Sequence, residues 1–296
     1  MAARRSTTSH QARWIQGAGA ESGPSTKSVP SAESRPSAES GPSAESRSLE
    51  FLGEEPLLIR IDGEPYLVVM RTPGGEREQA VGFCLGEGIV DSPDDIATIG
   101  FDDLVDPNVI DLWLRPERLA RVRELLGRKR FVSQTSCGIC GKQLIEDLHQ
   151  DLTPAKDGFT VGIDRLFGCL AALDETQEYY ETTRASHAAL LFDERAKLMC
   201  FAEDVGRHNA LDKAIGLAFL ARRLPDARIA VLSSRNSYEL IQKTARARIP
   251  ILVSKSRPTA LAVALGKSLN MTLAFPDKSR LVVVCGESRI LLGTTP

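Results

Sequence analysis

Two cysteines, Cys137 and Cys140, stand three residues apart among glycines and small hydroxyl residues. Gly138 follows the first cysteine, Gly141 follows the second, and Lys142 comes next. Such a stretch is unsuited to a packed core, because glycine has no side chain to bury and loses much conformational freedom on ordering. The reactive form of cysteine is the thiolate, which a neighbouring ammonium group favours. The pattern therefore predicts a loop that does chemistry at sulfur.

Three chemistries use a Cys-x-x-Cys pair, and the sequence leaves two of them open. A structural zinc site needs four ligands, but the chain has no second Cys-x-x-Cys and no His-x-x-x-His, so we expect no metal site. Thiol–disulfide exchange uses this spacing, although its motif is expected near a βαβ pattern. In sulfur transfer, a thiolate accepts a sulfane sulfur, holds it as a persulfide and delivers it. Spacing alone does not separate disulfide exchange from sulfur transfer.

Nucleobase deamination is a fourth chemistry, and the residues argue against it. Zinc deaminases need His-x-Glu followed later by Pro-Cys-x-x-Cys. Ala189 stands two residues after His187, and Ala210 stands two residues after His208, so no glutamate is available. Ser136 precedes the first cysteine, where the motif has proline. The chain is therefore not expected to deaminate a base, even on a related fold.

The bulk composition excludes several classes of protein. The formal net charge of -2 over 296 residues gives no reason to expect nucleic acid or an anionic membrane as a partner. No apolar run is long enough to cross a bilayer, and no apolar block follows Arg4-Arg5 as a signal peptide would require. Four further cysteines lie in apolar surroundings and are expected to be small buried hydrophobes: Cys84, Cys169, Cys200 and Cys285. We expect a cytoplasmic globular protein.

A six-residue unit recurs near the N-terminus, in Ser28–Glu33, Ser34–Glu39 and Ser40–Glu45. The repeat contains proline and almost no large apolar residue, so it cannot bury enough surface to offset the entropy of ordering it. We therefore predict that residues 1–48 form a disordered tail.

A small α/β unit is expected over residues 49–130. Its strands are predicted at 57–61, 66–70 and 109–114, and its helices begin near Glu76 and at Pro116. A hairpin signal, Asp62-Gly63-Glu64-Pro65, joins the first two strands. The Cys-x-x-Cys loop follows this unit and covers residues 131–143.

Strands and helices alternate through the remaining residues, 144–296. Strands are expected at 188–192, 198–202, 228–232, 249–253, 271–275 and 281–284. Helices are expected at 164–173, 208–222, 237–247 and 258–269. This alternation predicts a sheet that helices cover on both faces.

Three polar loops each follow an expected strand and precede an expected helix, at 203–209, 233–238 and 254–259. Ligands of such sheets bind beyond the carboxyl ends of the strands, and helix N-termini offer free N–H groups to anions. The same loops contain the cations Arg207, Arg235, Lys255 and Arg257. The sequence therefore predicts a site for phosphate or pyrophosphate at one edge of the sheet.

Several stretches together resemble one family, the formate dehydrogenase accessory sulfurtransferases (FdhD), from about Glu54 to Arg280. The most specific stretch is Glu203-Asp204-Val205-Gly206-Arg207-His208-Asn209-Ala210 with Asp212-Lys213. Other matching stretches are Arg71-Thr72-Pro73-Gly74, Gly82-Phe83, Glu87-Gly88-Ile89, Ser136-Cys137-Gly138-Ile139-Cys140-Gly141 and Ser237-Tyr238-Glu239-Leu240. The resemblance implies an α/β fold in which residues 144–296 form a cytidine deaminase-like, three-layer C-terminal domain without the zinc site.

The resemblance also implies a function. Family members take sulfur from a cysteine desulfurase onto the Cys-x-x-Cys loop. They pass it to the molybdenum (or tungsten) bis(molybdopterin guanine dinucleotide) cofactor destined for formate dehydrogenase. By position, Cys137 is expected to hold the persulfide and Cys140 to assist it or replace it. The cofactor has two pyrophosphates, which agrees with the predicted anion site. Family members are usually homodimers, so a homodimer is expected.

The resemblance implies two groups of cofactor-binding residues. One is a loop near the C-terminus, which corresponds to Phe275, Pro276, Asp277, Lys278, Ser279 and Arg280. The other comes from the matched motifs and comprises Arg207, His208 and Arg235, with Asp204 beside them. An ion pair between Asp204 and Arg207 is the structural alternative for part of this group.

The chain departs from the family pattern in the loops expected to hold the cofactor. Ser234 stands where the family commonly has the glycine of Ser-Gly-Arg, Arg184 and Ala185 replace two glycines, and Asp277 stands where an arginine is common. Side chains then fill space that glycine leaves for a close backbone approach. These departures leave open a different cofactor or another sulfur acceptor. Two other functions also stay open, a non-catalytic molybdenum-cofactor-binding chaperone and a dithiol oxidoreductase.

Overall fold

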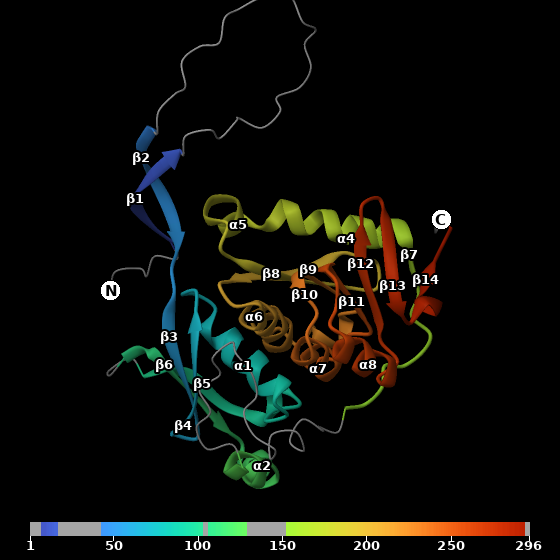
Figure 1. The fold of residues 1–296 in the computed structure, drawn as a ribbon. Helices are drawn as coiled ribbons and strands as arrows, with labels where there is room; N and C mark the ends of the chain where they lie inside the picture. The colour runs from blue at the N-terminus through green and yellow to red at the C-terminus, as the bar shows by residue number, and fades with distance from the viewer. Residues whose placement is uncertain (1–6, 17–42, 103–105, 129–151, 294–296) are drawn as a thin grey trace, which may run out of the picture.

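The computed structural model describes residues 7–16, 43–102, 106–128 and 152–293 (Figure 1). Cys137, Cys140 and the predicted loop at 131–143 lie outside the described residues. The described part is a mixed α/β protein, with a four-stranded sheet in the N-terminal half and a six-stranded sheet after it.

The four-stranded sheet belongs to the small N-terminal unit and has the order β4-β3-β6-β5. Its elements are β3 (Glu55–Ile61), β4 (Glu64–Arg71), α1 (Glu76–Gly86), the short 3-10 helix η1 (Pro93–Asp95), β5 (Ile96–Asp102), β6 (Asp106–Leu114) and α2 (Pro116–Arg128). Asp62 and Gly63 join β3 to β4, and both have positive φ angles, 49° and 80°. This conformation suits a two-residue turn between twisted antiparallel strands.

The six-stranded sheet has the order β13-β12-β11-β10-β8-β9. Its strands are β8 (His187–Phe192), β9 (Leu198–Asp204), β10 (Ile229–Arg235), β11 (Ile251–Ser256), β12 (Thr272–Asp277) and β13 (Arg280–Cys285). β11 pairs in parallel with β10 and with β12, whereas β8 runs antiparallel to β10 and to β9. β9, β10, β11 and β12 therefore end at the same side of the sheet, which we call the carboxyl edge.

Helices cover both faces of this sheet. They are α4 (Ile163–Thr176), α5 (Glu178–Thr183), α6 (Arg207–Leu220), α7 (Tyr238–Arg246) and α8 (Ala260–Ser268). Along β10, Ile229 and Val231 pack in a cluster with α4, while Ala230 and Leu232 pack in the cluster with α6 and α7. This alternation is the two-residue period of a strand that is buried on both sides.

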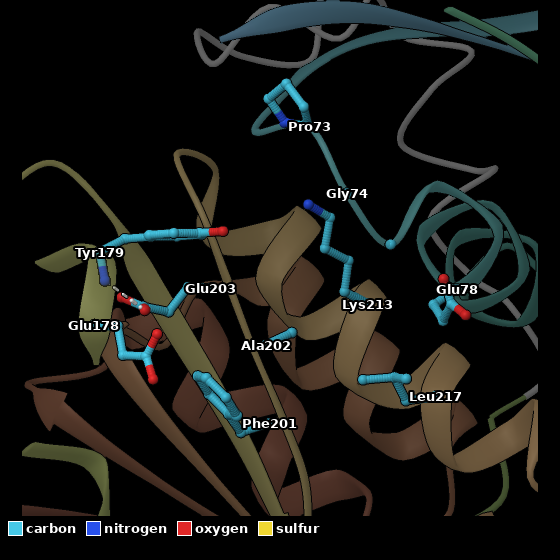
Figure 2. Close-up of a pocket in the computed structure, with 11 residues that line it drawn as sticks. Pro73, Gly74, Glu78, Glu178, Tyr179, Phe201, Ala202, Glu203, Lys213 and Leu217 are labelled. Carbon is cyan, nitrogen blue, oxygen red and sulfur yellow. Dashed lines mark hydrogen bonds between the residues drawn. The ribbon is translucent and has the colours of Figure 1, made fainter. Parts of the chain in front are cut away.

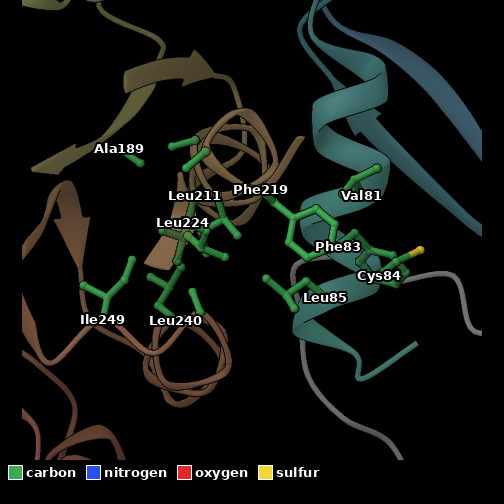
Figure 3. Packing of buried hydrophobic residues seen from close by; sticks show 14 of the residues in the cluster. Val81, Phe83, Cys84, Leu85, Ala189, Leu211, Phe219, Leu224, Leu240 and Ile249 are labelled. Carbon is green, nitrogen blue, oxygen red and sulfur yellow. The ribbon is translucent and has the colours of Figure 1, made fainter. Parts of the chain in front are cut away.

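The N-terminal unit and the six-stranded sheet share one hydrophobic core. Phe83 and Leu85 of α1 and Leu211 and Phe219 of α6 belong to the same buried cluster (Figure 3). The two helices approach closely because Gly82 of α1 and Gly216 of α6 have no side chain at the crossing. A Cβ atom on Gly82 would lie 1.9 Å from the carbonyl oxygen of Asp212, and one on Gly216 would lie 1.8 Å from that of Glu78. The crossing fixes the N-terminal unit against α6.

The region predicted to be a disordered tail contains two strands in the structure. β1 (Thr7–Gln16) and β2 (Ser43–Leu52) pair antiparallel in a two-stranded sheet that extends away from the larger sheets (Figure 1). Their pairing uses backbone groups, which a composition argument about burial does not address. The repeat between the two strands lies outside the described residues up to residue 42.

Most of the predicted elements agree with the structure to within about three residues, but several short ones went unpredicted. These are β5, α5, the short 3-10 helices η1, η2 (Leu224–Asp226) and η3 (Glu287–Arg289), and the parallel pair of β7 (Val161–Gly162) with β14 (Ile290–Leu291). Among the described residues, no helix is both long and apolar enough to span a membrane.

Candidate functional site

The structure brings the predicted cofactor-binding residues of the described chain to the carboxyl edge. Arg207 and His208 are the first residues of α6, and Arg235 is the last residue of β10. The stretch 275–280 forms the end of β12, the turn and the start of β13. The strand directions explain this gathering, because β9, β10 and β12 all end there.

Three helices begin at this edge, each directly after a strand. The N-cap residues are Gly206 for α6, Ser237 for α7 and Thr259 for α8. The backbone N–H of Thr259 donates to the carbonyl oxygen of Asn236 at 3.0 Å, which ties the two neighbouring loops together. The first N–H groups of a helix have no partner inside the helix and favour an anion. Three N-termini side by side therefore make this edge electropositive.

Two buried polar groups at this edge have no hydrogen-bond partner among the described residues. Both side-chain atoms of Asn236 are unpartnered, although the residue is 0% exposed. The Nε atom of Arg207 is also buried and unpartnered. Buried polar groups almost always have a partner, and an exception calls for an explanation. Both groups are closed to solvent, so they lie beneath the surface of the edge and not on it.

A histidine–glutamate pair stands beside these groups. His208 Nε2 lies 3.3 Å from a carboxylate oxygen of Glu239, and the Ser237 hydroxyl donates to the same oxygen at 2.9 Å. The hydrogen bond from His208, followed by the one from Ser237, lowers the pKa of Glu239 to about 2 despite its partial burial. Burial and the charge of Arg207 lower the pKa of His187. The lowered pKa disfavours the charged form of His187, so this side chain adds little to the positive charge of the edge.

The hairpin between β12 and β13 adds exposed cations to the edge. Lys278 and Arg280 are exposed, and Lys278 has a φ of 57° at the turn. Asp277 lies 3.7 Å from Arg280 and offsets part of its charge. The guanidinium of Arg257 lies 5.9 Å from the ring centroid of Phe275, a cation–π contact that holds the neighbouring loop against the hairpin.

Asp204 is fully buried and forms the centre of a hydrogen-bond network. Its carboxylate accepts from the backbone N–H groups of Thr72 (3.1 Å) and Gly206 (2.8 Å) and from the side-chain amide of Asn209 (2.8 Å). It also lies 2.6 Å from Lys213 Nζ, which donates to the carbonyl oxygen of Thr72 at 2.8 Å. The motif from Glu203 to Lys213 therefore holds the N-terminal loop around Thr72 against α6.

The alternative prediction, an ion pair between Asp204 and Arg207, is wrong. The buried ion pair of Asp204 is with Lys213, not with Arg207. Lys213 lies nearly two turns into α6, and helical side chains lean back toward the helix N-terminus, so its ammonium group reaches the strand end. Asn236 lies in the polar loop predicted at 233–238, but no feature of the sequence predicts that its side chain is buried.

The profile of the FdhD/NarQ family matches residues 52–291. The chain belongs to this family. A curated relative named sulfur carrier protein FdhD, from Mycolicibacterium paratuberculosis, is 40% identical over 229 residues, which are 74% of this chain and 84% of that protein. Another of the same name, from Xanthomonas campestris pv. campestris, is 36% identical over 241 residues, which are 81% of this chain and 85% of that protein.

The fold agrees with that of a solved structure described as a formate dehydrogenase accessory protein from Desulfotalea psychrophila. The TM-score is 0.66 at 23% sequence identity, and the match covers 84% of this chain and 94% of the other. The predicted resemblance to FdhD is thus confirmed at the level of the family.

A small pocket of about 250 Å³ lies beside the Asp204 network in this FdhD/NarQ protein (Figure 2). Glu203 and Tyr179 line one wall, and Lys213 and Leu217 line the other. Glu203 is already bonded, because it accepts from the backbone N–H of Tyr179 at 2.9 Å. Lys213 is engaged by Asp204. The pocket therefore marks the joint between the two units, and two of its polar side chains, Glu203 and Lys213, are already engaged there.

The cysteines among the described residues are packed side chains and not reactive thiols. Cys84, Cys169 and Cys285 are buried, as predicted, whereas Cys200 is half-buried and lies 3.3 Å from the carbonyl oxygen of Ala214. Burial raises the pKa of Cys169 to about 12 and that of Cys200 to about 11. A thiol with so high a pKa contains almost no thiolate at neutral pH. Among the described residues, no cluster of His, Cys, Asp and Glu could hold a metal ion.

Proposed function

We propose that this protein carries sulfur as a persulfide on Cys137 and transfers it to the molybdenum bis(molybdopterin guanine dinucleotide) cofactor that formate dehydrogenase needs. One observation carries the proposal: a chain with an intact Cys-x-x-Cys loop is 40% identical to a relative named sulfur carrier protein FdhD. A cysteine desulfurase is the proposed donor. We infer that the protein acts as a cytoplasmic homodimer, and that the sheet with helices on both faces has the layering of the cytidine deaminase fold.

Loading of the carrier requires a single nucleophilic displacement. The Cys137 thiolate attacks the terminal sulfur of the donor's cysteine persulfide, and a new S–S bond forms as the donor's S–S bond breaks. The donor cysteine leaves as a thiolate, so no external oxidant or reductant is needed. Lys142 favours the attacking thiolate, which is the nucleophilic form of cysteine.

Delivery gives Cys140 a separate role. Attack of the Cys140 thiolate on the inner sulfur of the Cys137 persulfide releases hydrosulfide and leaves a disulfide between the two cysteines. This step supplies the two electrons that convert sulfane sulfur into sulfide for the metal. The two thiols are then regenerated by a cellular dithiol reductant.

Mass spectrometry tests the loading step. The protein is incubated with a cysteine desulfurase and cysteine, and its intact mass is measured without reductant. We expect one added sulfur on the wild type and on Cys140→Ala, and none on Cys137→Ala. Cys200→Ala is the matched control and should keep the adduct, because that thiol is half-buried. An unmodified wild-type protein, or an adduct that persists in Cys137→Ala, would exclude Cys137 as the carrier.

The carboxyl edge is the proposed place for the cofactor, which is a substrate in this scheme. Each of its guanine dinucleotide arms has a pyrophosphate, and pyrophosphates bind at helix N-termini beside arginines. The exposed side chains of Arg235 and Lys278 support this assignment. Asp277 reduces the positive charge of the hairpin, so the arginines at the helix N-termini would contribute most of the attraction.

Binding of GDP, which corresponds to one arm of the cofactor, tests this assignment. A ligand at one hundred times its Kd stabilises the native state by about 2.7 kcal/mol, so the midpoint of thermal unfolding should rise. Loss of a charge-assisted contact in Arg235→Ala should weaken GDP about tenfold. Arg195→Ala removes the same charge from the turn between β8 and β9 and should change nothing. No rise at millimolar GDP, or equal weakening in both variants, would contradict the assignment.

A further inference from the structure

A second and larger cleft lies at the opposite side of the six-stranded sheet, which we call the amino edge. Its volume is about 1130 Å³. One wall is the N-terminal unit at Leu85 and 91–93, and the other is formed by the connections that follow α6, α7 and α8. Residues 153–159 complete the lining. The proposed function makes no use of this cleft.

Most of the carboxylates that line the cleft are already paired. Asp91 lies 2.5 Å from Arg118 and 2.6 Å from Arg246, and Asp157 lies 3.5 Å from Arg289. Glu194 forms no ion pair within the described part of the chain. The acidic side chains therefore leave little negative charge for a ligand.

Three cations that line the cleft are not paired with a carboxylate of the described residues. Lys156 and Arg248 are exposed, and neither forms an ion pair with another described residue. Arg228 donates to the carbonyl oxygens of Pro225 and Ala227, which are neutral groups. Against the single carboxylate of Glu194, these three cations give the cleft a net positive charge.

The backbone at Arg248 suits glycine, so the charge of this residue can be removed without disturbing the fold. Arg248 follows α7 with a φ of 60°, a left-handed conformation in which glycine is the favourable residue. Arg222 follows α6 with a φ of 55° and also lines the cleft, where it pairs with Asp94 at 3.0 Å. A cation at a helix C-terminus interacts favourably with the helix dipole, which offsets part of the strain. At both positions an arginine lines the cleft, although glycine would fit the left-handed backbone better.

The floor of the cleft is apolar. Phe219, Leu224 and Met271 lie there, and all three are buried. The volume exceeds the roughly 300–1000 Å³ of a typical small-molecule pocket. We propose that the cleft binds an acidic peptide segment of a partner protein, whose carboxylates meet Lys156, Arg228 and Arg248 above this floor. Complementary charge would set both the specificity and the rate of such an association.

A fluorescein-labelled octapeptide of alternating glutamate and leucine is a suitable probe. Its binding to the full chain is measured by fluorescence anisotropy, without desulfurase or cofactor, so the result is independent of the proposed sulfur transfer. Arg248→Gly removes the charge and suits the left-handed backbone, so the protein should stay folded. Arg184→Gly is the matched control, because Arg184 has a φ of 56° at the end of α5 and lies outside the cleft.

We expect the peptide to bind the wild type and Arg184→Gly equally, and Arg248→Gly about tenfold more weakly. Lys156→Ala added to Arg248→Gly should weaken it further, and binding to the wild type should fall as salt rises. Absence of binding to the wild type would overturn the proposal, as would equal weakening by both glycine variants. Displacement of the peptide by equimolar GDP would assign the cleft to nucleotides and overturn it too.

Discussion

Replacing Gly82 or Gly216 by alanine is expected to lower the free energy of unfolding by about 3 kcal/mol, a large part of the 5–15 kcal/mol of a typical domain. The new Cβ atom would lie within 1.9 Å of a carbonyl oxygen of the facing helix in either case. A backbone oxygen cannot rotate away, so α1 and α6 would have to separate. Separation would also strain the hydrogen bond that the Thr72 N–H donates to Asp204 and the one that Lys213 donates to the Thr72 carbonyl oxygen.

Urea denaturation followed by circular dichroism measures this effect, and Gly168→Ala supplies a matched control. Gly168 is an exposed residue of α4, and a Cβ atom there would meet nothing within 4 Å. Because alanine is a better helix former than glycine by about 1 kcal/mol, Gly168→Ala should stabilise the protein slightly. If the Gly82 and Gly216 variants behaved like the control, α1 and α6 could not be packed as described.

Lys213→Met is expected to destabilise the protein by about 3–5 kcal/mol, because it leaves the carboxylate of Asp204 buried without its countercharge. Asp204 is 0% exposed and Lys213 is 4% exposed, so solvent cannot replace the lost ammonium group. The loop around Thr72 would lose a hydrogen bond as well. Adding Asp204→Asn to Lys213→Met should restore part of the loss, since the amide has no charge to bury.

Lys255→Met is the control for this prediction. Lys255 pairs with Asp174 at the surface, and exposed pairs of that kind contribute at most about 1 kcal/mol. The free energies of unfolding of the variants are compared under the same conditions. Equal effects of Lys213→Met and Lys255→Met would show that the Asp204 pair does not hold the two units together.

The elements that position the carboxyl edge could be predicted from the sequence, because their signals are local. β10 and β11 are runs of buried apolar residues, and Pro116 and the Asp62-Gly63 turn mark an element start and a hairpin. Once strands alternate with helices, the loops after successive strands are expected at one edge. The sequence therefore predicts Arg207 and Arg235 at one edge of the sheet, where the structure places them.

The features that were not predicted depend on contacts between distant residues. The partner of Asp204 depends on how α6 leans toward the loop at Thr72, 132 positions away in the chain. The unpartnered amide of Asn236 depends on burial by surrounding elements. The cleft at the amino edge requires the N-terminal unit to be placed against the helix ends. No residue spacing encodes these relations, which arise only from the packing of the whole chain.

Two rival functions make different predictions for the same protein. A non-catalytic cofactor chaperone would bind GDP at the carboxyl edge but would gain no sulfur from a desulfurase. A dithiol oxidoreductase would cycle between the Cys137–Cys140 disulfide and two thiols at a defined potential, without a persulfide. The sulfur carrier requires both cofactor binding and a persulfide, so delivery of sulfur separates it from either rival.

Transfer of labelled sulfur is the most direct test of the sulfur-carrier proposal. The protein is loaded with ³⁵S from a desulfurase and separated from the donor. It is then mixed with the molybdenum cofactor and with formate dehydrogenase that lacks the transferred sulfur. We predict that label and formate oxidation appear together in formate dehydrogenase, and that Cys137→Ala yields neither. Full activation by Cys137→Ala, or label that stays on the wild-type carrier while activity appears, would contradict the proposal.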